Sequence, residues 1–135
     1  MNEKYFAKAD FTLFLHQLRV YDHNEQIAHI EQHFRLIEPE FSFYLEGQKI
    51  GRIIKEFTFL RPRYVLDFKD WKIQGNFFGL DYEVIDSSGK MIMRFSKELF
   101  HFTDHYCLEI YDDENEKLCL LIALAVDLAV CSQSD

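Results

Sequence analysis

The sequence predicts a mainly β protein, a closed barrel of about twelve strands around a central hydrophobic C-terminal helix at residues 116–131. Three observations lead to this fold class. Residues 118–126 are all apolar, and after Asp127 the apolar run continues to residue 131. Short segments rich in Phe, Tyr, Ile and Val precede this run, and several of them recur at a fixed spacing. A helix that is apolar on every face must be buried, and a sheet closed around it would bury it.

The strands are indicated by a repeat and by turn signals. A shift of 23 residues aligns six pairs of residues: Tyr21/Tyr44, Ile27/Ile50, Ile30/Ile53, Phe34/Phe57, Pro39/Pro62 and Phe41/Tyr64. A third copy follows 43 residues after the second, and residues 71–80 resemble a degenerate fourth. Turns at residues 22–25, 46–47 and 86–89 separate short β-type segments. Each unit would supply about three strands, so four units predict about twelve.

The apolar run has the length of a barrel plug. Its fourteen positions, 118–131, would form a helix of roughly 21 Å, whereas a bilayer core is about 30 Å thick. Strands of six to eight residues give a barrel of similar height, about 20–26 Å. Asp113 and Glu116 are three residues apart, as in a capping box, which predicts the helix start. We therefore expect a buried helix and no transmembrane segment.

Length and composition predict one domain over residues 1–135. The net charge of −8 disfavours a nucleic-acid partner, because such binding needs a basic surface. The first residues lack the features of a signal peptide, so a cytoplasmic protein is expected. Cys107, Cys119 and Cys131 are odd in number and form no C-x-x-C pair, which predicts small core residues. No sequence motif for a phosphate loop, a nucleophile elbow or a zinc protease is present, so neither a cofactor nor a catalytic residue is predicted.

Positive charge gathers in the middle of the chain. Between residues 49 and 72 there are seven basic residues and three acidic ones, although the chain as a whole is acidic. Five of the basic residues are candidates for an anion site: Lys49, Arg52, Lys55, Arg61 and Arg63. The alternative, that these side chains cover the solvated faces of strands, stays open.

Two histidine pairs and one acidic segment are candidate metal ligands. His29/His33 and His101/His105 would be neighbours on a helix but lie about 13 Å apart on a strand. Since the repeat places both pairs on strands or corners, no metal site is predicted there. Residues 112–116 are acidic but lack the glycine of a calcium loop, which favours a helix start over a calcium site.

Together, the motifs resemble the LURP-one-related family over residues 8–131. They comprise Phe-x-φ-x-x-Pro-x-aromatic at residues 34–41 and 57–64, the segment 70–77, and the closing Leu-Leu-Ile-Ala-Leu-Ala-Val-Asp helix. The family is similar in fold to the tubby C-terminal domain and to phospholipid scramblases. The resemblance therefore implies a tubby C-terminal-like domain, a twelve-stranded barrel threaded by its last helix.

The resemblance also implies a class of ligand. Tubby-type domains bind phosphoinositides through basic residues outside the barrel, and scramblases act on membrane lipids, although no tubby lipid-binding motif can be matched here. We therefore predict a non-catalytic intracellular binding module for anionic phospholipid head groups, peripheral to the membrane, that uses the five basic residues. A small-molecule enzyme without a recognisable motif and a protein-interaction module remain alternatives. A deep exterior cleft lined by His29, His33 or Asp104 would favour the enzyme.

Overall fold

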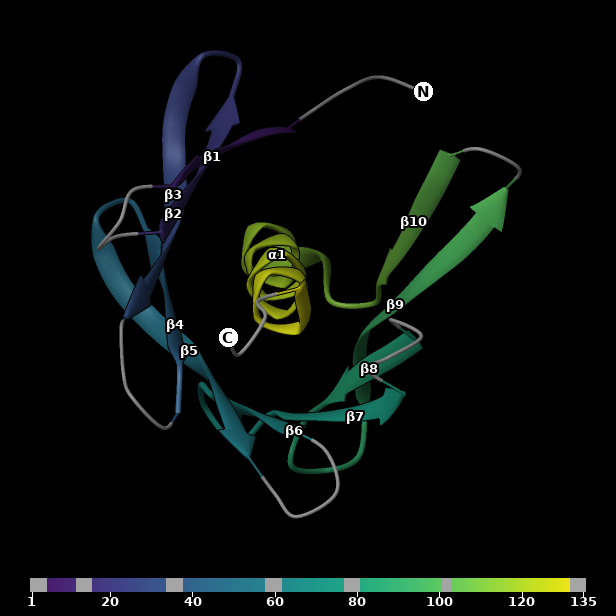
Figure 1. Ribbon diagram of the computed structural model, residues 1–135. Helices are drawn as coiled ribbons and strands as arrows, with labels where there is room; N and C mark the ends of the chain where they lie inside the picture. Colours follow the sequence, from purple (N-terminus) through teal and green to yellow (C-terminus); the bar gives the residue numbers. More distant parts are fainter. Residues whose placement is uncertain are drawn as a thin grey trace.

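The computed structural model describes residues 5–11, 16–33, 38–57, 62–76, 81–100 and 103–131. Ten strands and a C-terminal helix, α1, lie within these ranges (Figure 1). The strands are β1 (Tyr5–Phe11), β2 (His16–Asp22), β3 (Glu25–His33), β4 (Glu40–Leu45), β5 (Gln48–Phe57), β6 (Pro62–Asp67), β7 (Lys72–Asn76), β8 (Asp81–Ile85), β9 (Met91–Phe100) and β10 (Thr103–Ile110). The 3-10 turn η1 (Asp113–Asn115) leads into α1 (Glu116–Cys131).

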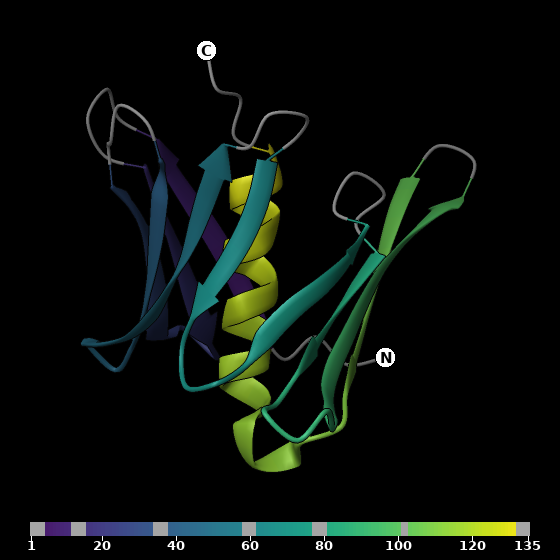
Figure 2. The same cartoon turned by 90° about the horizontal axis from the view of Figure 1, so that it is seen from below.

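The strands form two antiparallel sheets. One sheet has six strands in the order β1-β2-β3-β4-β5-β6, and the other has four in the order β10-β9-β8-β7. Neighbours in each sheet are also consecutive along the chain, so both sheets are meanders of hairpins. Figure 2 shows α1 running lengthwise between the two sheets, which curve around it.

The prediction of a twelve-stranded closed barrel is therefore wrong. Among the described residues, β6 and β7 meet at a corner without a hydrogen-bonded ladder, and β1 and β10 are the outer strands of separate sheets. The strand count was too high because successive repeat units share a strand. A shift of 23 residues maps β2 and β3 onto β4 and β5, so each repeat adds two strands rather than three.

An aromatic corner connects the two sheets. The chain turns sharply after β6, where Lys69 has a φ of 49° and the Trp71 N–H donates to the Phe68 carbonyl at 3.3 Å. The rings of Phe68 and Trp71 meet edge to face, with centroids 5.0 Å apart. Trp71 is buried, so apolar packing joins the sheets at the place where a closed barrel would have hydrogen bonds.

The turns within the six-stranded sheet are short and of the predicted kind. His23 and Asn24 have φ angles of 52° and 74°, and Glu46 and Gly47 have φ angles of 52° and 82°. Two successive residues with positive φ are characteristic of the tight hairpin turn that matches strand twist. The turn between β8 and β9 is held by Asp86, whose Oδ1 accepts bonds from the main-chain N–H groups two and four residues later.

The prediction of a C-terminal helix is confirmed, since α1 spans residues 116–131. The helix α1 is preceded by η1 at residues 113–115, and Asp112 before η1 makes no side-chain capping bond. Asn115 instead donates from Nδ2 to Asp112 Oδ2 at 2.7 Å. Within the described chain, no helix combines the length and hydrophobicity needed to cross a membrane.

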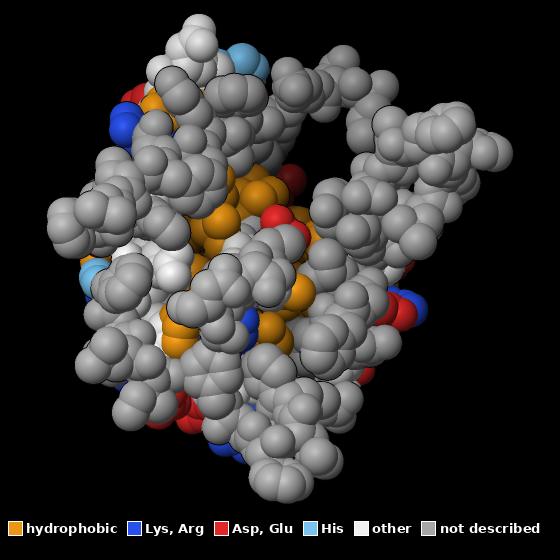
Figure 3. Space-filling model, viewed as in Figure 1, with side chains coloured by type: hydrophobic (Ala, Val, Ile, Leu, Met, Phe, Trp, Pro, Cys, Tyr) orange, Lys and Arg blue, Asp and Glu red, His pale blue; other side chains and the backbone are white. Residues whose placement is uncertain are grey.

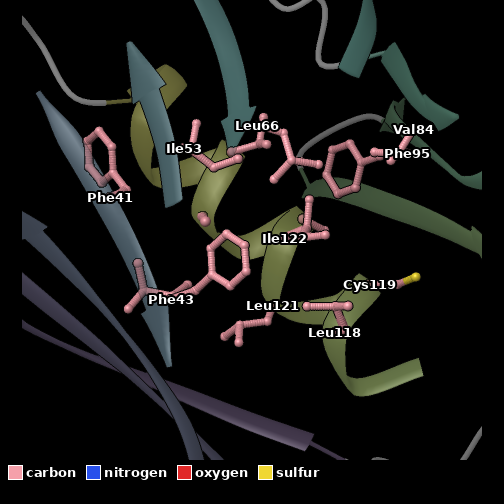
Figure 4. Packing of buried hydrophobic residues seen from close by; sticks show 14 of the residues in the cluster. Phe41, Phe43, Ile53, Leu66, Val84, Phe95, Leu118, Cys119, Leu121 and Ile122 are labelled. Atoms are coloured by element: carbon pink, nitrogen blue, oxygen red, sulfur yellow. The ribbon is translucent and has the colours of Figure 1, made fainter. Parts of the chain in front are cut away.

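Both sheets bury their inner faces against α1. Figure 4 shows Phe43 and Ile53 of the six-stranded sheet pointing toward the helix from one side and Phe95 of the four-stranded sheet lying on the other. On the helix, Leu121 and Ile122 are almost completely buried. The helix packs mainly on β4 and β5 and also contacts β3, β9 and β10. The helix is thus the shared core of two open sheets.

The cysteines were predicted to be core residues, and this holds for Cys119 but not for Cys107. Cys119 is fully buried on α1, and burial raises the pKa of its thiol to about 11. Cys107 is exposed on β10, because its side chain faces away from the core. The side chain of Cys131 lies outside the described residues.

This difference predicts selective modification by a thiol reagent. At mildly alkaline pH, iodoacetamide should label Cys107 rapidly and Cys119 only after unfolding, because a buried, protonated thiol is a poor nucleophile. Peptide mapping by mass spectrometry, with and without denaturant, would measure the two rates. Equal labelling of both residues in the native protein would contradict the burial of α1.

Candidate functional site

The structure brings together three of the five predicted anion-binding residues. Lys49 and Arg52 on β5 and Arg63 on β6 have side chains that are 47%, 33% and 67% exposed. Side chains alternate along β5, so that Gly51, Ile53 and Lys55 are buried while Arg52 points to the opposite face. This opposite, outward surface of the six-stranded sheet is called the outer face below.

Lys55 is separated from the other three. It is only 5% exposed and lies on the core side of β5, so it is not available at the outer face. Its main-chain N–H donates to the Pro39 carbonyl at 3.0 Å, next to the start of β4. Arg61, the fifth predicted residue, lies outside the described residues.

Arg52 is the centre of a cross-strand network on the outer face. Its Nη1 donates to Glu40 Oε1 at 2.6 Å, and its Nε donates to Asp67 Oδ2 at 2.8 Å. The antiparallel register explains both contacts, because Arg52 lies opposite Ser42 on β4 and opposite Asp67 on β6. Both hydrogen bonds raise the pKa of Arg52, and the bond to Asp67 has the larger effect. The guanidinium group therefore remains charged.

Glu40 is buried although it belongs to the outer face. Its side chain is 5% exposed, and a carboxylate in such a place needs charged and hydrogen-bonding partners. Arg52 provides the closest contact, Ser42 Oγ donates to Glu40 Oε2 at 3.3 Å, and Lys49 Nζ lies 3.9 Å from the same oxygen. Glu40 therefore holds two of the candidate cations in place.

Arg63 has a separate partner. Its Nε and Nη2 both donate to Glu56 Oε1, at 3.0 Å and 2.5 Å, across the β5–β6 pair. Arg63 is well exposed, and such surface ion pairs stabilise a fold by about 0–1 kcal/mol. The pair therefore orients Arg63 more than it stabilises the sheet.

Aromatic and histidine side chains continue the outer face toward β3. The rings of His29 and Tyr44 are stacked almost parallel, with centroids 4.3 Å apart. His29 Nε2 lies 3.3 Å from Glu31 Oε1, and Glu31 also accepts a hydrogen bond from the Tyr44 hydroxyl. Burial is the main reason why the pKa of Tyr44 is raised, and the negative charge of Glu31 and its hydrogen bond raise it further. The phenol is therefore neutral at physiological pH.

The predicted metal candidates do not converge in the described part of the chain. No group of three or more His, Cys, Asp or Glu side chains there is arranged to hold a metal ion. His29 and His33 lie four positions apart on one strand, β3. For the second pair, only the backbone of His105 is described, and His101 lies outside the described residues.

The three residues that would have lined an enzyme cleft are divided between the sheets. His29 and His33 belong to β3, whereas Asp104 belongs to β10 of the four-stranded sheet, and its side chain is not described.

The acidic half of the outer-face network was not predicted from the sequence. Glu40, Glu56 and Asp67 each pair with one or two of the candidate cations. A signal was available, because a turn at residues 46–47 brings the start of β4 opposite the middle of β5. Glu40 lies outside the basic segment 49–72, so a count of charges along that segment does not reveal this pairing.

Comparison with known proteins agrees with the motifs. The chain is 25% identical over 109 residues to the uncharacterized protein YxjI of Bacillus subtilis (strain 168), an alignment that covers 81% of this chain and 67% of that protein. A search of the solved structures finds no significant match. The model of the family described as LURP-one-related matches residues 2–127. This match covers nearly the whole sequence, and the chain therefore belongs to the LURP-one-related family.

Proposed function

We propose that this protein is a non-catalytic binding module that receives anionic phospholipid head groups on its outer face, through Lys49, Arg52 and Arg63. One observation carries the proposal, namely that three partly exposed cations lie on the same surface of the neighbouring strands β5 and β6. Contact would be peripheral, with α1 remaining in the core. The phospholipid binding known for tubby-type domains, which this family resembles, supports the same class of ligand.

The carboxylates on this face set the conditions for binding. Glu40, Glu56 and Asp67 balance the three cations, so a phosphate must replace a carboxylate to gain a strong contact. Asp67 and Glu56, with side chains 58% and 31% exposed, can rotate toward solvent, whereas the buried Glu40 cannot. A head group would thus take the place of Asp67 on Arg52 or of Glu56 on Arg63.

This exchange predicts weak, salt-sensitive association. One basic residue near an anionic surface contributes about 1 kcal/mol, and exposed charges are screened within about 8–10 Å at physiological salt. Cosedimentation should therefore show binding at low salt to vesicles of phosphatidylcholine mixed with phosphatidylserine. Binding to phosphatidylcholine alone should be negligible, and high salt should release the protein from the mixed vesicles.

Variants of the competing carboxylates test the site itself. Asp67→Asn combined with Glu56→Gln should increase binding to the anionic vesicles severalfold, because the cations lose their competitors. Arg63→Gln should decrease it. A matched control, Glu25→Gln with Glu46→Gln, removes the same amount of negative charge at exposed positions beside two hairpin turns and should change binding little.

Two results would contradict the proposal: equal sedimentation with both kinds of vesicle, or no increase for Asp67→Asn with Glu56→Gln. In either case a protein-interaction module would become the better description. Arg52 is left unchanged in these tests, because its loss would leave the buried Glu40 without its closest partner.

A further inference from the structure

The side of the molecule between β1 and β10 is open in the described structure. β1 pairs only with β2, and β10 pairs only with β9, so each strand has one edge without a strand partner among the described residues. Figure 1 shows β1 and β10 well separated, with β1 to the upper left of α1 and β10 to its right. A free strand edge presents main-chain N–H and C=O groups that can pair with a strand from another chain.

The helix α1 has one face that is only partly covered by the two sheets. Leu120, Leu124 and Leu128 are spaced four residues apart, share one face of α1 and are only partly buried. The opposite face is buried and includes Leu118, Ile122, Ala125 and Ala129. The helix α1 packs mainly on β4 and β5 and less on β9 and β10, so its less covered face lies on the side away from β4 and β5. Figure 3 shows hydrophobic side chains visible between the two sheets at the centre of the molecule.

Negative charge gathers at the end of β10, beside the start of α1. Residues 109–117 contain five carboxylates and one lysine. Glu109, Asp113 and Glu114 are exposed, and Tyr111, 48% exposed, is the most exposed large hydrophobic side chain described. Tyr111 donates a hydrogen bond to Glu109 Oε2, which keeps the ring beside the strand end.

We propose that the free edge of β10 binds an extended segment of a partner protein, in which basic residues alternate with apolar ones, as an added strand. The main chain of the segment would pair with β10, its apolar side chains would cover Leu120 and Leu124, and its basic residues would meet the carboxylates around Glu109. A second copy of this chain is a poor occupant. The strand β10 contains no Lys or Arg that could meet the carboxylates around Glu109, and the protein as a whole has a net charge of −8.

This binding mode is independent of lipid binding. It uses β10, on the other side of α1 from β5, and it uses carboxylates instead of the basic side chains of the outer face. A suitable probe is a capped eight-residue peptide of alternating Lys and Val, added to the full chain labelled with nitrogen-15. Amide chemical shifts should change along β10 and at Leu120 and Leu124, and amides of β10 that exchange quickly in the free protein should become protected. A peptide of alternating Glu and Val should cause neither effect.

Charge variants of the protein complete the test. Glu109→Gln combined with Glu114→Gln should weaken binding of the Lys-Val peptide by roughly threefold to tenfold, since each exposed charge contributes little. Glu25→Gln with Glu46→Gln removes equal charge far from β10 and should leave the affinity unchanged. No shift changes at millimolar peptide, changes confined to β4–β6 or to β1, or equal binding of the Glu-Val peptide would overturn the proposal.

Discussion

Leu121→Asp is expected to leave no cooperatively folded protein. Leu121 is 1% exposed and lies on α1 between the two sheets, so an aspartate there would be a buried charge without a partner. Losing a buried leucine side chain costs about 2–5 kcal/mol, and burying an ion adds several more. The sum is comparable to the whole stability of a typical domain, about 5–15 kcal/mol. Circular dichroism should show no sigmoidal thermal transition.

Alanine variants on the same helix provide a graded control. Leu121→Ala should lower the free energy of unfolding by about 2–5 kcal/mol, whereas Leu124→Ala should cost less, because Leu124 is only partly covered. Chemical denaturation of both variants would measure the difference. Equal losses of unfolding free energy for Leu121→Ala and Leu124→Ala would show that α1 is not the shared core. A native melting curve for Leu121→Asp would show the same.

Gly51→Val is expected to destabilise the six-stranded sheet strongly. A Cβ atom at Gly51 would lie 2.7 Å from the Asp67 carbonyl oxygen and 2.8 Å from Cζ of Phe43, a fully buried ring. Overpacking of a core costs about 1–3 kcal/mol for small additions, and valine adds two methyl groups beyond alanine. Gly51→Ala should thus cost about 1–3 kcal/mol and Gly51→Val more, as measured by chemical denaturation.

Gly47 provides the matched control. A Cβ there would meet no atom within 4 Å, but the φ of 82° disfavours any side chain. Gly47→Ala should therefore cost only about 1–2 kcal/mol of backbone strain. The close packing of β5 against Phe43 would be contradicted if Gly51→Val lowered the free energy of unfolding no more than Gly47→Ala does.

Local patterns in the sequence predicted the elements of the fold well. The apolar run after Lys117 predicted α1, because only burial between layers can accommodate a helix that is apolar all round. The predicted turn at residues 46–47 is a tight hairpin turn in the structure. Such features depend on neighbouring residues, so they can be predicted before the tertiary structure is known.

Closure of the sheet could not be predicted in the same way. Whether β6 continues into β7 depends on a sharp turn at Lys69 and on the packing of Phe68 against Trp71, which replaces ladder hydrogen bonds. Four repeats were equally compatible with a closed barrel and with two open sheets. The number of strands was overestimated because β4 is both the last strand of one unit and the first of the next.

The candidate site shows a similar division. The residue types of the basic segment were evident, but their faces were not, because one position along a strand moves a side chain to the other surface. Arg52 and Lys55, three residues apart on β5, consequently point to opposite sides. The acidic partners of Arg52 come from β4 and β6, and only the strand register identifies them.

The central claim is that α1 joins two separate sheets whose outer strands, β1 and β10, each lack a second strand partner among the described residues. Amide hydrogen exchange measured by NMR tests this claim most directly. The structure predicts that amides of α1 and of β4 and β5 exchange slowly. In β10, every second amide should exchange rapidly, because an edge strand directs alternate N–H groups away from its only neighbour. Slow exchange of every amide in both β1 and β10 would mean that these edges are paired, and it would contradict the open architecture.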